Sequence, residues 1–153
     1  MEKLKAGSPA PAFEATDQDG NKRTLADYAG RKLILYFYPK DNTPGCTAEA
    51  CSLRDGRDTL RRMGFEVVGV SPDSEKSHQG FIAKQGLNFT LLADTDKKIA
   101  EAYGVWGEKK FMGRTFMGIL RTTFVIDEQG VIEKIFDKVR TKDHFEQIVE
   151  AYQ

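Results

Sequence analysis

Six consecutive apolar residues, 33–38, lead directly into a stretch rich in turn-forming residues, 39–45. The run shows no alternation of apolar and polar residues, which is typical of a strand buried on both faces of an α/β sheet. Helix signals follow at once, because Thr43 is a candidate N-cap and Pro44 falls at the first helical position, where proline is favoured. Gly64 is placed to end this helix. The chain is therefore expected to build a strand–loop–helix unit, which indicates an α/β fold.

The rest of the chain alternates strand and helix signals without a repeat or a linker, so a single domain over residues 1–153 is expected. A polar hairpin is predicted at 13–25, with its turn at Asp19-Gly20. Further strands are predicted at 65–70, 89–92, 122–126 and 131–136, and further helices from the turn at 71–74 to Gly86, around 99–103 and at 145–152. Residues 104–120 are interpreted as an irregular segment. The strands at 33–38 and 65–70 should be parallel, and the last two antiparallel, which gives a three-layer α/β sandwich with a mixed sheet.

Charge and cysteine content argue against several functional classes. The 23 Lys and Arg residues balance 23 Asp and Glu residues, so no net field attracts nucleic acid or an anionic membrane. Two cysteines are too few for a secreted disulfide scaffold, and no apolar segment follows the charged first residues, so no signal peptide is expected. The longest apolar run, 33–38, is too short to span a membrane. We expect a soluble, cytoplasmic protein whose cysteines are chemical rather than structural.

Cys46 is the first candidate functional residue, because it falls two residues after Pro44, inside the first turn of the predicted helix. With Thr43 as N-cap, Cys46 takes position N3, where unsatisfied backbone N–H groups and the positive end of the helix dipole favour an anion. A thiolate is stabilised there, and the thiolate is the nucleophilic form of cysteine. The alternative is a buried structural cysteine, since Cys46 shares a helix face with Ala50 and Leu53.

Cys51 and Arg121 are weaker candidates on sequence grounds. Five residues along a helix place two Cα atoms roughly 8.7 Å apart, whereas a disulfide needs them within about 7 Å. Cys46 and Cys51 could therefore pair only if the first helical turns unwound, and otherwise Cys51 is a bystander. Arg121 opens the strand at 122–126 and could reach Cys46 if that strand lies beside the strand at 33–38. Otherwise Arg121 is a solvated charge or an ion-pair partner.

Four motifs, in order along nearly the whole chain, resemble those of the peroxiredoxins. They are Gly7-x-x-Ala10-Pro11-x-Phe13, Pro39-x-x-x-Thr43-x-x-Cys46 followed by Glu49 and Cys51, Val70-Ser71-Pro72-Asp73-Ser74, and Arg121-x-Thr123-Phe124-Val125-Ile126-Asp127. The spacing of two cysteines within one helix is similar to that of the Q subfamily, also called bacterioferritin comigratory protein or thioredoxin-dependent thiol peroxidase. The resemblance implies a thioredoxin-like fold with an N-terminal β-hairpin extension.

The resemblance also implies the roles of the site residues. Cys46 would attack the terminal oxygen of a hydroperoxide, which would give a sulfenic acid and water or an alcohol. Thr43 would hydrogen-bond the peroxide and the thiolate, and Pro39 would shield the site from water. Arg121 would favour the thiolate and polarise the O–O bond. Glu49 would orient arginine rather than transfer protons.

The second half of the implied cycle concerns Cys51 and a partner protein. Cys51 would resolve the sulfenic acid of Cys46 as an intramolecular disulfide after local unwinding of the helix, and thioredoxin or a similar dithiol reductant would reduce that disulfide. The resemblance implies no metal or organic cofactor. It further implies a monomeric, cytosolic protein.

Other interpretations of the thiols remain open at this point. A redox-sensing or chaperone-like thiol protein would oxidise once rather than turn over, and a dithiol oxidoreductase would carry Cys-x-x-Cys, which is absent. A metal site would need more ligands than the two scattered cysteines, His78 and His144. His78 is predicted on a helix surface and His144 in the first turn of the last helix. The segment from Trp106 to Met117 combines basic residues with aromatic residues, a mixture that could suggest nucleic-acid binding. We predict instead that its apolar side chains pack beside the active site.

Overall fold

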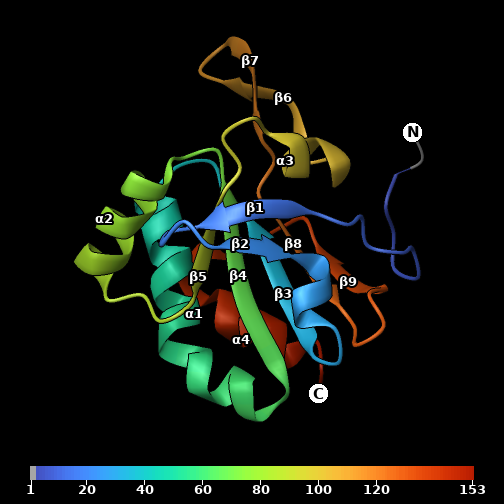
Figure 1. Ribbon diagram of the computed structural model, residues 1–153. Coiled ribbons are helices and arrows are strands. Elements are labelled where there is room, and N and C mark those ends of the chain that lie inside the picture. Colours follow the sequence, from blue (N-terminus) through green and yellow to red (C-terminus); the bar gives the residue numbers. More distant parts are fainter. Residues whose placement is uncertain (1–2) are drawn as a thin grey trace.

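The computed structural model describes residues 3–153 and confirms the mixed α/β sheet (Figure 1). Its strands are β1 (Glu14–Asp17), β2 (Lys22–Thr24), β3 (Lys32–Phe37), β4 (Phe65–Ser71), β5 (Thr90–Ala93), β6 (Trp106–Phe111), β7 (Arg114–Ile119), β8 (Thr122–Ile126) and β9 (Ile132–Phe136). Its helices are α1 (Pro44–Arg62), α2 (Glu75–Gln85), α3 (Lys98–Ala102) and α4 (His144–Glu150), with short 3-10 turns η1 (Leu25–Tyr28) and η2 (Thr141–Asp143). Within these described residues, no helix has the length and apolar character to cross a membrane.

Strand β3 lies inside the sheet, whose strand order is β2-β1-β5-β4-β3-β8-β9. As predicted, β3 runs parallel to β4, and β8 and β9 form an antiparallel hairpin. The predicted N-terminal hairpin is β1–β2, and it joins the same sheet because β1 pairs antiparallel with β5. The sequence expectation of a thioredoxin-like mixed sheet with this extension is confirmed.

The side chains of β3 alternate between two buried layers. Leu33, Leu35 and Phe37 belong to a core that includes residues of α3, whereas Ile34 and Tyr36 belong to a core with residues of α1, α2 and α4. Figure 1 shows α1, α2 and α4 on one side of the sheet and α3 on the other. Both faces of β3 are covered, which is why its sequence shows no polar alternation.

Helix α1 begins and ends where the sequence indicates, with Thr43 at the N-cap, Pro44 at the first position, and Gly64 just beyond the C-cap at φ +91°. Gly56, in the middle of the helix, marks a close helix–helix approach. A Cβ atom at position 56 would overlap the ring of Phe145 in α4. The glycine costs some helix propensity but allows α4 to pack directly on the α1 backbone.

The prediction for residues 104–120 is wrong. The segment forms an antiparallel hairpin, β6–β7, whose turn places Met112 and Gly113 at φ +51° and +77°. The hairpin projects from the body of the protein (Figure 1), and near its turn Phe111 and Met112 are 67% and 85% exposed, so these two side chains do not pack beside the active site. The hairpin was missed because its strands mix charged and apolar residues on both faces instead of alternating.

The predicted position of His78 on the helix surface is also wrong. His78 lies on α2, as expected, but its side chain is fully buried rather than on the helix surface. The physical reason is a set of buried polar partners on other elements, which compensate the loss of solvent. Sequence periodicity could not reveal them, because these partners lie in other segments of the chain.

Candidate active site

Cys46 occupies position N3 of α1, as the sequence predicts, and its side chain is buried with only 1% exposure. Ala50 and Leu53 belong to the same buried cluster, so Cys46 packs against the core as well as standing in the first turn of the helix. Thr43 takes the N-cap backbone conformation, but its hydroxyl donates to the carbonyl of Lys40 at 2.8 Å instead of capping the helix. The first-turn N–H groups beside the Cys46 sulfur therefore receive no side-chain cap from Thr43.

Arg121 reaches the cysteine because β8 pairs antiparallel with β3. The register sets Thr122 opposite Phe37, so Arg121 lies level with the end of β3, where the chain turns toward α1. Alternation along the strand puts Arg121 on the α1 face. Its Nη2 donates to the Cys46 sulfur at 3.2 Å, and its Nη1 donates to Glu49 Oε1 at 2.5 Å.

Glu49 lies one helical turn after Cys46 and is completely buried. Burial raises the pKa of Glu49 to about 7, although the Arg121 guanidinium acts in the opposite direction. Its second oxygen, Oε2, has no hydrogen-bond partner among residues 3–153. Nε2 of His144 lies 3.8 Å from this oxygen. Glu49 thus holds Arg121 through one oxygen and leaves the other unpaired.

His144, at the start of α4, is a residue of this site that sequence reasoning placed correctly but did not assign to it. Burial lowers the pKa of His144 to about 4, so the ring is neutral at pH 7. Its Nδ1–H donates to Gln147 Oε1 at 2.9 Å, and its Nε2 accepts from the Thr123 hydroxyl at 2.8 Å. Because Nε2 uses its lone pair in this way, it has no proton to give to Glu49.

Tyr36 was missed as a residue of the site because it is part of an apolar run. Its hydroxyl is buried without a hydrogen-bond partner. Burial raises the pKa of Tyr36 well above its usual value, and the charges of Glu49 and Cys46 raise it further. The phenol therefore stays neutral in this site. The alternation of β3 toward the α1 core was the one signal that could have found it.

The remaining predicted residues surround this centre. Cys51 is half-buried on α1, and its sulfur donates to Gln85 Oε1 at the end of α2 over 3.6 Å. Both cysteines are free thiols on a continuous helix. Pro39 follows the buried Tyr38, two residues after the end of β3, and is itself half-buried, at the start of the loop that leads to Cys46.

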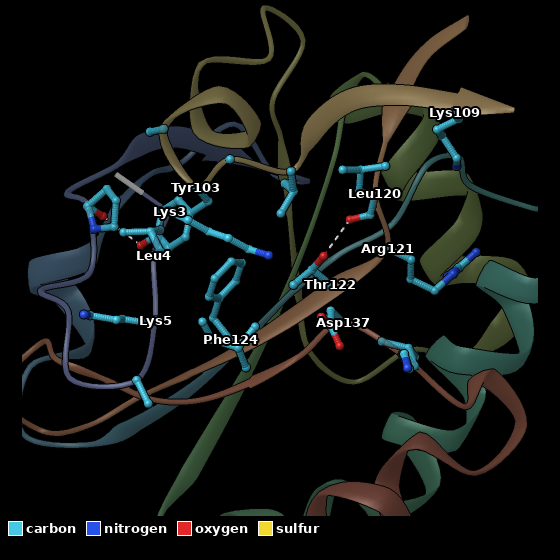
Figure 2. A pocket seen from close by; sticks show the side chains of 18 residues that line it. Lys3, Leu4, Lys5, Tyr103, Lys109, Leu120, Arg121, Thr122, Phe124 and Asp137 are labelled. Carbon is cyan, nitrogen blue, oxygen red and sulfur yellow. Dashed lines mark hydrogen bonds between the residues drawn. The ribbon is translucent and has the colours of Figure 1, made fainter. Parts of the chain in front are cut away.

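A large hollow of about 1460 Å³ adjoins this site at Arg121 (Figure 2). Tyr103, Thr122 and Phe124 line it, and Cys46 does not. Arg121 and Lys109 stand at one end, where Figure 2 shows the Arg121 side chain directed toward a helix rather than into the hollow. The reactive centre is therefore at the start of α1, on the opposite face of β8. In the part of the chain that the structure covers, no group of three or more His, Cys, Asp or Glu residues could hold a metal ion.

A buried cysteine in the first turn of a helix, with an arginine donating to its sulfur, defines a thiol-based oxidoreductase on a thioredoxin-like sheet. The chain belongs to the AhpC/TSA family, which matches residues 6–135. It is therefore a thiol peroxidase, as the sequence motifs predict.

Individual relatives are similar to this chain over nearly its whole length. The chain is 50% identical over 150 residues to the putative peroxiredoxin bcp of Haemophilus influenzae, and the match covers 98% of this chain and 97% of the relative. It is 48% identical over 149 residues to peroxiredoxin Bcp of Escherichia coli, covering 97% and 96%. Among solved structures, it resembles a cysteine-to-serine variant of Xylella fastidiosa PrxQ with a TM-score of 0.92 and 32% identity, covering 99% and 97% of the two chains.

Proposed function

We propose that Cys46 is the peroxidatic cysteine and that it reduces hydrogen peroxide and organic hydroperoxides. Its thiolate attacks the terminal oxygen, so an S–O bond forms as the O–O bond breaks. The sulfur is oxidised to a sulfenic acid, and the departing oxygen takes a proton to become water or an alcohol. The observation that carries this proposal is the 3.2 Å contact between Arg121 Nη2 and the Cys46 sulfur. A cation in this place stabilises the thiolate and the charge that develops on the peroxide oxygens.

The other loop and helix residues position the reactants. The Thr43 hydroxyl donates to Lys40, which leaves its lone pairs free to accept a hydrogen bond from the peroxide. Pro39 covers the loop side of the site and excludes water. Glu49 fixes the arginine, so that Arg121 keeps one nitrogen on the sulfur and the other on the carboxylate.

Cys51 is the proposed resolving cysteine. Its thiol condenses with the sulfenic acid of Cys46, which forms the S–S bond and releases water. The first turns of α1 must unwind for this step, and they lack part of their backbone hydrogen bonding. The helix is anchored immediately after Cys51, because the Ser52 hydroxyl accepts from the backbone N–H of Phe145 at 3.0 Å. Unwinding would then stop near residue 52.

The partner that completes the cycle is proposed to be thioredoxin or a similar dithiol, which reduces the disulfide by thiol–disulfide exchange. The half-buried Cys51 offers this dithiol the more accessible sulfur. We further propose a monomer that works in the cytoplasm. The main sheet takes strands from Glu14 to Phe136, which supports one domain over residues 1–153.

The test is the intact mass of reduced protein after brief exposure to one equivalent of hydrogen peroxide, with excess free cysteine as competitor. Loss of two hydrogens is expected, because Cys46 outcompetes an ordinary thiol and Cys51 resolves it. Gain of one oxygen without that loss would remove Cys51 from the mechanism. An unchanged mass would overturn the assignment of Cys46. The control Cys46→Ser should consume no peroxide, whereas Cys51→Ser should be oxidised once and then fail to recycle with thioredoxin.

A further inference from the structure

A second buried polar cluster lies beside the loop that leads to Cys46. Asp41 belongs to that loop, and its carboxylate accepts three hydrogen bonds. Tyr38 Oη donates to Oδ1 at 2.6 Å, and Ser77 Oγ and His78 Nδ1 donate to Oδ2 at 2.8 Å each. The side chains of Asp41 and His78 are 1% and 0% exposed. The cluster therefore joins the loop to α2 without help from solvent.

Both ring nitrogens of His78 face acceptors. Nδ1 lies 2.8 Å from the Asp41 carboxylate, and Nε2 lies 2.9 Å from the backbone carbonyl of Leu92 in β5. A carbonyl oxygen can only accept, and so can an ionised carboxylate. Burial alone would raise the pKa of Asp41, but the hydrogen bonds from His78 and Tyr38 outweigh it and lower that pKa, so the carboxylate is ionised. Both nitrogens are therefore placed to donate, which is the hydrogen-bonding pattern of an imidazolium.

The same cluster also holds the loop backbone. The N–H of Asp41 donates to Asp73 Oδ2 at 2.8 Å, and Asp73 accepts a further hydrogen bond from the Ser71 hydroxyl at 2.7 Å. The next residue, Asn42, is in the left-handed region at φ +65°, a conformation that asparagine tolerates better than most residues. Asp41 is therefore fixed through both its side chain and its backbone, midway between Pro39 and Thr43.

We propose that His78 is a positioning residue for the peroxidase reaction, which as an imidazolium holds Asp41 and thereby keeps Pro39 and Thr43 in place around the Cys46 sulfur. The proposal rests on the proposed role of Cys46. The anchor also sets the N-terminal limit of helix unwinding, just as the Ser52 contact sets the C-terminal limit. The chain between these two anchors can rearrange for disulfide formation and return to the same geometry when it is reduced.

The protonation of His78 can be observed in the wild-type protein. In ¹H–¹⁵N spectra of the reduced protein at pH 7, with assignment by comparison with His78→Leu, we expect two ring N–H signals from His78. One ring N–H signal, from a neutral ring, would overturn the proposal. The measurement is made on the wild-type protein, and His78→Leu serves only to assign the signals.

The positioning role is tested by the rate constant for oxidation of Cys46 by hydrogen peroxide. His78→Leu and Asp41→Asn should each slow this step about 10- to 100-fold, because a small displacement of groups around a reacting atom has effects of that size. Hydrogen exchange at the Asp41 amide should also be faster in both variants. Asp94→Asn is the matched control. It removes another buried carboxylate, but one that binds the N–H groups of Ile99 and Ala100 in α3, so folded Asp94→Asn should react at the wild-type rate.

The outcomes separate this inference from the proposed function. A folded His78→Leu protein that reacts at the wild-type rate would overturn the positioning role and leave Cys46 as the peroxidatic residue. A wild-type protein whose Cys46 does not react with peroxide would overturn the proposed function itself. If His78→Leu does not fold, Asp41→Asn, which nearly preserves shape, decides the question by the same rate measurement.

Discussion

Replacing Glu49 by glutamine should change how the stability of the reduced protein depends on pH. The pKa of this buried carboxyl is raised from 4.5 to about 7, mainly by burial. The folded state therefore binds the proton more tightly than the unfolded state does. The stabilising contribution is fully present below pH 4.5 and is lost as the pH rises through 7. At 1.36 kcal/mol for each pH unit between the two values, the loss is about 3 kcal/mol.

His144 has an opposite effect over nearly the same pH range. Burial lowers its pKa from 6.5 to about 4, so the folded state binds this proton less tightly than the unfolded state. Its contribution is present above pH 6.5 and is lost as the pH falls through 4, again by about 3 kcal/mol. In the wild-type protein the effects of Glu49 and His144 largely cancel, and each should become visible only when the other is removed.

The assay is urea denaturation of reduced wild type, Glu49→Gln, His144→Gln and the double variant between pH 4 and 8. The unfolding free energy of Glu49→Gln relative to wild type should rise by about 3 kcal/mol across this range, and that of His144→Gln should fall by about 3 kcal/mol. The unfolding free energy of the double variant should depend on pH in nearly the same way as that of the wild type. The reasoning would be refuted if the difference in unfolding free energy between Glu49→Gln and wild type changed by less than about 1 kcal/mol between pH 4 and 8. The carboxyl would then titrate at its ordinary pKa.

Three further substitutions test the site and its supporting helix. Arg121→Met should lower the rate constant of Cys46 with hydrogen peroxide by about 100- to 1000-fold in stopped-flow measurements, because it removes a charged donor aimed at the reacting sulfur; a fall below tenfold would contradict that role. Thr43→Val should slow the same step about tenfold, as expected for one lost hydrogen bond, whereas Thr43→Ser should keep the wild-type rate. Gly56→Val should destabilise the protein by about 3 kcal/mol or more in urea titrations, because the new side chain overlaps Phe145. Gly80→Ala on α2 is the control: a Cβ there meets nothing within 4 Å, so it should stabilise slightly.

The local parts of the site could be predicted from the sequence because they depend on neighbours in the chain. The apolar run of β3, the proline at the start of α1 and the N3 position of Cys46 all follow from local rules. The contact between Arg121 and Cys46 could not, because it depends on the pairing of β3 with β8, two distant segments. The residues alone made Arg121 a candidate only if the two strands are neighbours, and the resemblance to peroxiredoxins implied its role in the site.

The burial of two histidines could not be predicted from the sequence, for the same physical reason. His78 and His144 are polar residues on helices, and a sequence pattern gives no sign of the partners that bury them, Asp41 and Thr123. The β6–β7 hairpin was misread for a different reason. The apolar residues near its turn, Phe111 and Met112, are not covered by the rest of the chain, so the usual rule that apolar residues mark the core predicts the wrong environment for them.

The contact between Gly56 and Phe145 has a consequence for how this sequence can change over time. The two positions share one volume, so a larger residue at 56 requires a smaller residue at 145. A chain that changes position 56 first passes through an overpacked protein, and one that changes position 145 first passes through a protein with a cavity between α1 and α4. Both single steps weaken the attachment of α4 to the half of α1 that must stay helical. Substitutions at these two positions should therefore appear together among functional descendants of this chain, and seldom alone.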